Sequence, residues 1–181
     1  MKPTTEVTFR EIETPVGGVR VVCRGPRLVA IHIGDQLAAP GPRDATHDPA
    51  LAGPVIDQLE EYFAGERRAF DLEFDLEGTP FQQIVWRTLA TIPFGESISY
   101  GELARRVGRP SAVRAVGGAN ARNPISIVVP CHRVVGADGR LTGYAGGLPI
   151  KRFLLDHERR VLGGGAAEAQ GDLLTFGGLS A

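Results

Sequence analysis

The stretch SYGELARRVGRPSAVRAVGGANARN, residues 99–123, sets the fold expected for the second half of this 181-residue chain. SYGELARRVG predicts a short helix that ends at Gly108, and PSAVRAVGGANARN predicts another helix with Pro110 near its start. A tight GRP turn joins them, which fits a helix-turn-helix motif. An ordinary helical hairpin explains the same pattern at least as well, so the residues leave both interpretations open.

Further helical patterns flank this stretch. Before it, TPFQQIVWRTLATIPFG, residues 79–95, offers Thr79 as an N-cap and Pro80 as the first helical residue. The residues expected to share its buried face are Ile84, Val85, Leu89 and Ile92. After it, ISIVVPCH predicts a buried extended run and GADGRLTGYAGG a glycine-rich loop. LPIKRFLLDHERRVL, residues 148–162, predicts the last helix.

The first half predicts a small sheet with one helix. Three strand-like segments between Thr8 and Ile33, TFREIETP, GVRVVCR and RLVAIHIG, are separated by turn signals. LAAPGPRDATHDP predicts a loop, and FDLEFDLEG predicts a further strand or a linker. ALAGPVIDQLEEYFAGE predicts a helix that ends at Gly65. Its residues at helical spacing are Val55, Leu59 and Tyr62 or Phe63.

These patterns predict an α+β fold in two domains. A sheet-containing domain is expected over residues 1–78, and a mainly helical domain over residues 79–162. The tail, residues 163–181, is rich in glycine and alanine and is expected to be flexible.

The composition is that of a soluble globular protein, with 43% hydrophobic residues, 23% charged residues and a formal charge of -1. No apolar run approaches the roughly 20 residues that span a bilayer, and the first residues lack a secretory signal. We therefore expect no membrane association and a cytoplasmic protein. Cys23, His32 and His47 are scattered without ligand spacing, so neither a metal site nor a cofactor is expected.

Charge divides along the chain. Residues 1–78 hold 8 Lys and Arg against 14 Asp and Glu, whereas residues 100–160 hold 11 against 4. A basic surface is the electrostatic footprint of a polyanion binder, although a solvated surface accounts for most such excesses. The basic half therefore only suggests nucleic acid.

The basic half also contains VVPCHRVVG, residues 128–136, in which Cys131 adjoins His132. A cysteine is a nucleophile only as the thiolate, so a base must take its proton. Because neighbours in an extended chain point to opposite faces, a water bridge between the two side chains is a reasonable expectation. Cys23, inside the strand-like VRVVCR, is expected to be a small apolar core residue.

PCHRV in this glycine-flanked setting resembles the active-site signature of the O6-alkylguanine-DNA alkyltransferases. The likeness extends from FQQIVWRTLATIPFG to LPIKRFLLDHE, residues 81–158. Before residue 81 the chain resembles the family only in outline. It implies a small RNase H-like sheet domain, and then a helix-turn-helix domain that carries the acceptor cysteine. It also implies DNA repair in which each molecule takes one alkyl group from O6-alkylguanine, and possibly from O4-alkylthymine, irreversibly and without a cofactor.

The resemblance assigns roles in the active site to particular residues. Cys131 would accept the alkyl group, and His132 would take the thiol proton through water. Glu158, in preference to Asp156, would orient the imidazole. The other residues with implied roles are Asn123, which would link the helix end to the active-site turn, Tyr100, which would donate a proton to the base, and Val134, Tyr144 and Ala145, which would line the base pocket. Many members have serine where Ala145 stands, which leaves the substrate preference open.

The resemblance further implies that the damaged base is flipped out of double-stranded DNA, with the recognition helix in the minor groove. Arg114 would fill the gap as an arginine finger. The small residues that would let the helix approach the DNA backbone are Ser111, Ala112, Ala115, Gly117 and Gly118, and the arginines that would hold phosphates are Arg105, Arg106, Arg109 and Arg122. A monomer is expected, with cooperative binding along DNA left open.

Two other functions fit part of the sequence. A helix-turn-helix regulator would use residues 100–123 but would not need a reactive thiol. A cysteine-histidine hydrolase or acyltransferase would use Cys131 and His132 and would ignore DNA.

Overall fold

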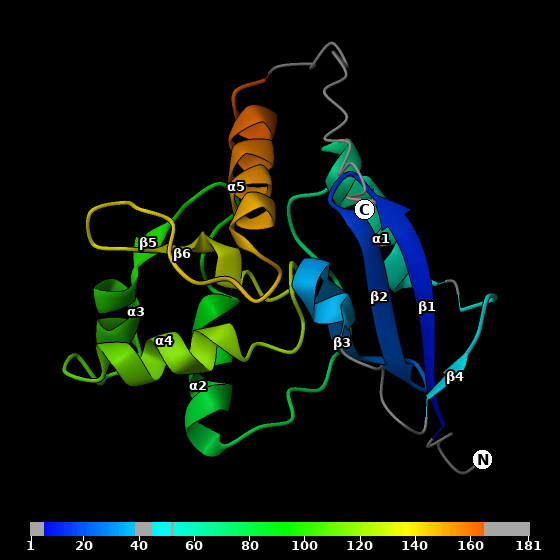
Figure 1. Ribbon diagram of the computed structural model, residues 1–181, viewed down its shortest axis with the longest axis horizontal. Coiled ribbons are helices and arrows are strands. Elements are labelled where there is room, and N and C mark those ends of the chain that lie inside the picture. Colours follow the sequence, from blue (N-terminus) through cyan, green and yellow to red (C-terminus); the bar gives the residue numbers. More distant parts are fainter. Residues whose placement is uncertain (1–5, 39–44, 52, 165–181) are drawn as a thin grey trace, which may run out of the picture.

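The computed structural model describes residues 6–38, 45–51 and 53–164. Helix α5 (Leu148–Leu162) lies between a small sheet, with its helix α1 (Pro54–Ala64), and a second group of helices (Figure 1). The α+β class expected from the sequence is confirmed. Most of the tail, from residue 165 onward, lies outside the described residues, so its expected flexibility is untested.

The sheet has the strand order β3-β2-β1-β4. Strand β1 (Val7–Thr14) pairs antiparallel with β2 (Gly17–Arg24), which pairs antiparallel with β3 (Arg27–Ile33). The turns Pro15-Val16 and Gly25-Pro26 join them, as the sequence predicts, and a short 3-10 helix, η1 (Gly34–Ala38), follows. Strand β4 (Ala45–His47) pairs parallel with the edge of β1. The sequence predicts only a loop there, because three half-buried or exposed residues show no strand periodicity.

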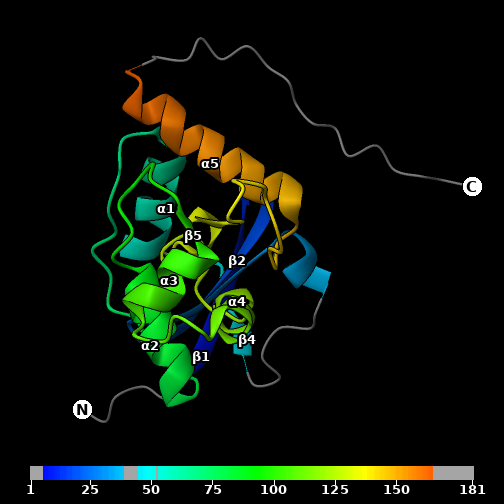
Figure 2. The same ribbon diagram turned by 90° about the vertical axis from the view of Figure 1, so that its left-hand side faces the viewer.

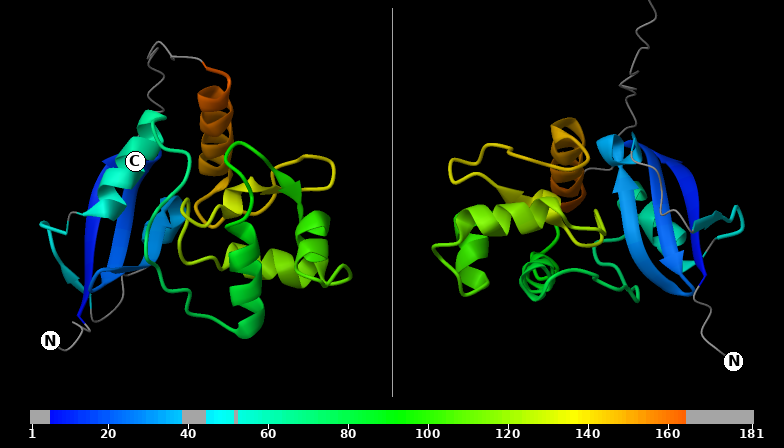
Figure 3. Two further views of the ribbon diagram at one scale, coloured as in Figure 1. Left: turned by 180° about the vertical axis from the view of Figure 1, so that it is seen from behind. Right: turned by 60° about the horizontal axis from the view of Figure 1, so that its bottom comes forward.

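Helix α1 lies against the sheet (Figure 3). The side chains that the sequence places on one face of this helix belong to the core that it shares with the sheet. Val55, Leu59 and Tyr62 are buried, whereas Phe63 is only partly buried. Burying each large apolar side chain stabilises the fold by roughly 1.5–3 kcal/mol. The helix ends at Gly65, whose φ of 80° lies in the left-handed region that glycine adopts without strain.

The second half begins with α2 (Pro80–Leu89). Thr79 forms a capping box with Gln82, as its position before the helix predicts. The predicted buried face is wrong at Ile84, which is 51% exposed. Trp86 is buried on that face instead. Its indole Nε1 donates to the carbonyl of Ala119, in the helix over Val113–Ala121, at 2.8 Å.

The helix-turn-helix pair consists of α3 (Tyr100–Arg106) and α4 (Val113–Ala121), which contact each other and α2. Ser99 caps α3 by accepting a hydrogen bond from the Glu102 backbone. Helix α4 begins at Val113, three residues later than the sequence predicts. Ser111 and Ala112 therefore belong to the turn before α4, with Ala112 at the N-cap position.

The segment ISIVVPCH is buried as expected but is not extended. It forms a series of turns that ends in a short 3-10 helix, η2 (Cys131–Arg133). A two-residue strand, β6 (Val134–Val135), then pairs parallel with β5 (Ile98–Ser99) and brings the chain back beside α3. Helix α5 has the predicted bounds and crosses one side of the molecule (Figure 2). No helix of the described residues has the length and apolar character needed to span a membrane.

Candidate active site

The turns before Cys131 are held by one buried side chain. The Asn123 side-chain oxygen accepts from the Ile125 N–H at 3.1 Å, and its Nδ2 donates to the Val129 carbonyl at 2.7 Å. Between them, Ile127 has a φ of 72°, which is strained for a β-branched residue and costs about 1–3 kcal/mol. Asn123 thus joins the end of α4 to the turn that carries Cys131.

Strand β3 holds the same turn from the other side. The Ile31 N–H donates to the Pro124 carbonyl at 2.9 Å, and Ile31 forms an isolated bridge with Ile125. The Cys131 N–H donates to the Val129 carbonyl at 2.8 Å. The thiol is therefore presented by a backbone that both halves of the chain hold in place.

His132 and Glu158 form a completely buried pair. The His132 Nε2 lies 2.8 Å from the Glu158 Oε1, and both side chains are 0% exposed. An ionised carboxylate only accepts hydrogen bonds, so Nε2 must carry the hydrogen. In the neutral ring Nδ1 is then the basic nitrogen, and it makes no hydrogen bond within the described part of the chain. Nδ1 is the atom available to take a proton from a thiol.

Among the described residues, Glu158 accepts more hydrogen bonds than any other acidic side chain. Besides His132, its donors are the Arg133 guanidinium, through Nη2 at 2.9 Å and Nε at 3.0 Å, the Tyr62 hydroxyl at 2.9 Å and the Gly95 N–H at 2.8 Å. Burial opposes ionisation, but the hydrogen bonds and charges of His132 and Arg133 outweigh it and lower the pKa of Glu158 to about 2. Glu158 is therefore a fixed negative charge at neutral pH.

The pKa of His132 is lowered by burial, although Glu158 acts in the opposite direction. The resting ring is consequently neutral at pH 7 and ready to accept a proton. A positive charge formed on it would lie against the Glu158 carboxylate.

Burial raises the pKa of the Cys131 thiol. The Asn123 amide, the Lys151 ammonium and the backbone N–H groups of Cys131 and His132 act in the opposite direction. The resting sulfur is therefore a thiol rather than a preformed thiolate. Its proton must leave as the sulfur reacts, which is the task of a general base.

Lys151 lies on α5 beside the thiol and is completely buried. Its Nζ donates to the Val134 carbonyl at 2.6 Å and to the Thr142 carbonyl at 2.8 Å. Burial lowers the pKa of Lys151 to about 8, and the negative charge of Cys131 acts in the opposite direction. Any negative charge on the sulfur is therefore partly offset by this ammonium.

Two tyrosines lie around the thiol. The Tyr100 hydroxyl donates to the Thr142 carbonyl at 3.4 Å, and the Lys151 ammonium lies 5.9 Å from the centre of the Tyr100 ring. Burial and the charge of Cys131 raise the pKa of Tyr100 and, more strongly, that of Tyr144. Both phenols therefore stay protonated and can donate hydrogen bonds. Ala145 follows Tyr144 and is partly buried.

The predicted DNA-contacting residues lie on α3, in the turn that follows it, on α4 and at the C-terminal end of α4. Arg114 and Ala115 are exposed, Gly117 and Gly118 are partly buried, and Ser111 and Ala112 lie in the turn before the helix. At the end of the helix, the Arg122 Nη1 donates to the Gly118 carbonyl at 3.0 Å. Arg105 and Arg106 form ion pairs with Glu102, and Arg109 is exposed. The C-terminal part of α4 also contacts the backbone that carries the thiol, because the Asn120 Nδ2 donates to the Cys131 carbonyl at 3.5 Å.

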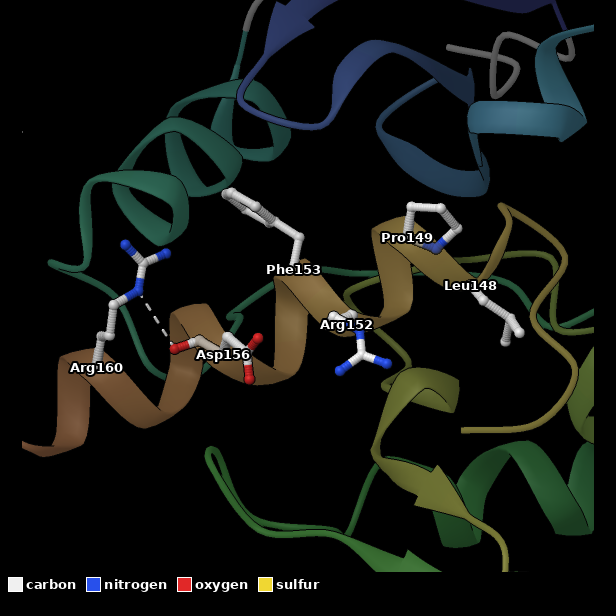
Figure 4. A pocket seen from close by; sticks show the side chains of 6 residues that line it. All are labelled: Leu148, Pro149, Arg152, Phe153, Asp156 and Arg160. Carbon is white, nitrogen blue, oxygen red and sulfur yellow. Dashed lines mark hydrogen bonds between the residues drawn. The ribbon is translucent and has the colours of Figure 1, made fainter. Parts of the chain in front are cut away.

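Asp156, the less favoured acid of the sequence analysis, is not near His132. It pairs with Arg159 at 3.1 Å and lines a pocket of about 720 Å³ on the outer face of α5. Figure 4 shows Arg152, Asp156 and Arg160 along this face, and Glu158 is not among the residues that line the pocket. Asp156 and Glu158 are two residues apart, about half a helical turn, so α5 presents one acid to the imidazole and the other to solvent.

Cys23 lies in β2, and burial raises its pKa. Its side chain is 4% exposed and lies in the hydrophobic core, as the strand-like sequence around it predicts. Among the described residues, no group of three or more His, Cys, Asp or Glu side chains is arranged to hold a metal ion.

A family model described as "6-O-methylguanine DNA methyltransferase, DNA binding domain" matches residues 80–160. A second, described as the ribonuclease-like domain of the same family, matches residues 7–76. The chain belongs to the 6-O-methylguanine DNA methyltransferase family. The small sheet domain and the helix-turn-helix domain are the two parts that this family combines, and the resemblance noted from PCHRV is confirmed.

Curated relatives and solved structures agree with this placement. A methylated-DNA--protein-cysteine methyltransferase of Mycolicibacterium paratuberculosis is 49% identical over 154 residues, which cover 85% of this chain and 93% of the relative. One from Methanosarcina acetivorans is 61% identical over 101 residues, or 56% of this chain and 65% of the relative. The crystal structure of Mycobacterium tuberculosis OGT in complex with DNA matches with a TM-score of 0.80 and 48% identity, covering 85% of this chain and 94% of that one.

Within this methyltransferase fold, four residues that contact the site were missed by sequence reasoning. They are Tyr62, Asn120, Arg133 and Lys151. Arg133 had a signal, because it directly follows the Cys-His pair. The other three had none, because burial of a polar side chain at a site depends on elements that are distant in the sequence.

Proposed function

We propose that this chain is a methylated-DNA:protein-cysteine S-methyltransferase that repairs O6-alkylguanine in double-stranded DNA by taking the alkyl group onto Cys131. The observation that carries the proposal is the buried series Cys131, His132 and Glu158 at the end of a helix-turn-helix pair with exposed arginines. A buried thiol with its own base, placed beside a DNA-binding motif, fits a nucleophile whose substrate is part of DNA.

The reaction is an in-line displacement. A bond forms between the Cys131 sulfur and the alkyl carbon as the bond from that carbon to O6 breaks. The thiol proton passes to the His132 Nδ1, directly or through a water, and Glu158 stabilises the imidazolium. The departing guanine takes a proton from Tyr100, and the resulting phenolate regains a proton from the His132 imidazolium, so that the thiol proton is balanced by the one gained by guanine. Lys151 offsets charge on the sulfur during the attack.

The product explains why one molecule acts once. The alkyl group is held in a thioether, which is a poor leaving group toward water. Nothing in the site supplies a second nucleophile to remove it, as far as the described residues extend. The protein is therefore consumed by the reaction.

A duplex hides O6 inside the stack, so the damaged base must be flipped toward the buried thiol. The exposed Arg114 would fill the gap, the small residues of α4 would let the helix lie in the minor groove, and Arg105, Arg106, Arg109 and Arg122 would hold phosphates. Val134, Tyr144 and Ala145 would surround the flipped base, with Asn123 keeping the turn in place.

The 48% identical mycobacterial relative was crystallised with DNA, which supports a DNA substrate for this chain. Such a substrate also supports the cytoplasmic location expected from the sequence, and we retain a monomer as the acting form.

The direct test uses a duplex that contains one O6-methylguanine. One equivalent of protein should remove one methyl group and then become inactive, and the peptide that contains Cys131 should gain the mass of one methyl group. Continued turnover would contradict the proposal, as would a methyl group on the Cys23 peptide.

The role of Arg114 in base flipping predicts a selective defect. Arg114→Ala should repair duplex DNA far more slowly, because no side chain would then fill the gap left by the flipped base. Unstacking a base costs a few kcal/mol, so we expect the rate to fall by roughly 10–100-fold or more. Its reaction with free O6-benzylguanine should change little, because a free base needs no flipping. Rates with both substrates, measured on the same preparation, supply the control. An equal loss on both would remove Arg114 from this role.

A further inference from the structure

Tyr62 is the point at which the N-terminal half touches the His132–Glu158 pair. It comes from α1, 96 residues before Glu158 in the sequence, and is 0% exposed. Its hydroxyl donates to the Glu158 Oε1 at 2.9 Å, and the same oxygen receives the His132 Nε2 at 2.8 Å. A tyrosine of the first half and the histidine of the second half thus share one carboxylate oxygen.

The Tyr62 ring is held tightly in place. The rings of Phe63, Phe70, Phe94 and His157 lie 5.2–6.0 Å from it, centre to centre. In addition, the His157 Nε2 lies 2.7 Å from the Tyr62 carbonyl, which ties the backbone of α1 to α5. Because the ring cannot move freely, the direction in which its hydroxyl meets the carboxylate is set by the packing of α1.

The Tyr62 hydroxyl can only act as a donor here. Burial, followed by the charge and hydrogen bond of Glu158, raises its pKa well above 10. The phenol is therefore neutral throughout the physiological range. It has one hydrogen, and that hydrogen is directed at Glu158.

We infer that Tyr62 is a positioning residue for alkyl transfer: its hydroxyl fixes the Glu158 oxygen that orients the His132 ring. The inference rests on the proposed function. It also gives the first half of the chain a specific part in the reaction, together with the hydrogen bond from Ile31 that holds the turn before Cys131. The first half supports the thiol through its backbone and the base through a side chain.

The other donors cannot replace this contact. Gly95 donates to the second oxygen, Oε2, and Arg133 spreads its guanidinium over both oxygens. Without the Tyr62 hydroxyl, Oε1 would keep the His132 ring and the Arg133 guanidinium but would lose the donor that comes from the first half of the chain. The imidazole would then point correctly for a smaller fraction of the time. We therefore expect alkyl transfer to slow on the order of tenfold.

The test compares Tyr62→Phe with wild type in single-turnover reactions on an O6-methylguanine duplex at saturating protein. The rate constant at saturating protein measures the reactivity of each molecule. Because each molecule reacts once, the amplitude of a parallel reaction with the duplex in excess counts the correctly folded molecules. We expect Tyr62→Phe to retain full amplitude and unchanged DNA affinity, with a rate constant roughly tenfold lower. A change that only weakens folding would reduce the amplitude and leave the rate constant alone.

Gln58→Met is the matched control from the same helix. Gln58 is 8% exposed and makes two hydrogen bonds to the Asp71 backbone, at 2.9 and 2.8 Å, without touching Glu158. It should lower stability while the rate constant stays at the wild-type value. The inference is overturned if Tyr62→Phe reacts at the wild-type rate, or if Gln58→Met slows the reaction equally. A wild-type protein that transfers no methyl group would instead sink the proposed function, so the two failures are distinct.

Discussion

Cys131→Ala is expected to bind an O6-methylguanine duplex with wild-type affinity and to remove no methyl group from it. The sulfur is the atom that forms the bond to the alkyl carbon in the proposed reaction, whereas the exposed α4 residues proposed to hold DNA are untouched. Cys131→Ser keeps a polar atom at the same place and should be equally inactive, because a hydroxyl is a far weaker nucleophile. Fluorescence anisotropy would measure binding, and loss of labelled methyl would measure transfer.

This pair of measurements also separates the competing functions. A regulator that merely binds DNA would keep its whole activity in Cys131→Ala. A hydrolase or acyltransferase would lose activity in the variant too, but the wild type would turn over an ester or amide and ignore DNA. Methyl transfer by Cys131→Ala would contradict the assignment of the acceptor.

Glu158→Gln is expected to slow alkyl transfer by roughly 10²–10⁴-fold, the range typical of lost general acid–base catalysis. The amide has the shape of the carboxylate but carries no charge to stabilise an imidazolium on His132. It also leaves the Arg133 guanidinium, whose side chain is 7% exposed, without its counterion. Asp156→Asn, an exposed acid on the same helix, is the matched control and should react at the wild-type rate.

The same variant predicts a change in how stability depends on pH. The pKa of Glu158 is about 2 in the folded chain and 4.5 as an unperturbed group, so its ionised form favours folding. That difference corresponds to on the order of 3 kcal/mol, present above about pH 4.5 and lost as the pH falls toward 2. His132 acts in the same direction below its ordinary pKa of 6.5, because burial disfavours its protonated form.

Urea unfolding between pH 7 and pH 3 would measure this effect. The free energy of unfolding of wild type should fall steeply over the acidic part of the range. In Glu158→Gln it should start lower at pH 7, because Arg133 is buried and unpaired, and should fall less steeply. An identical slope in the two proteins would mean that Glu158 does not carry the proposed charge.

Local patterns in the sequence were sufficient for most of the elements. The three long strands, the end of α1 at Gly65 and the bounds of α5 follow from periodicity and from capping residues. The local patterns failed to predict the structure where the periodicity and capping signals were weak or misleading. Strand β4 is too short to show a period, and the run before Cys131 has the apolar composition of a strand but folds into turns because Asn123 and β3 hold it there.

The sequence by itself determined the family, the Cys-His pair and, through the resemblance, a preference for Glu158 over Asp156. Only the tertiary structure decided that Glu158 meets His132 while Asp156 faces outward, that Lys151 is buried beside the thiol, and that Tyr62 reaches Glu158 from 96 residues away. The physical reason is the sequence distance over which each kind of interaction acts. Strand and helix periods report on neighbours within a few residues, whereas the protonation and orientation of a buried group depend on partners that packing brings together from distant parts of the chain.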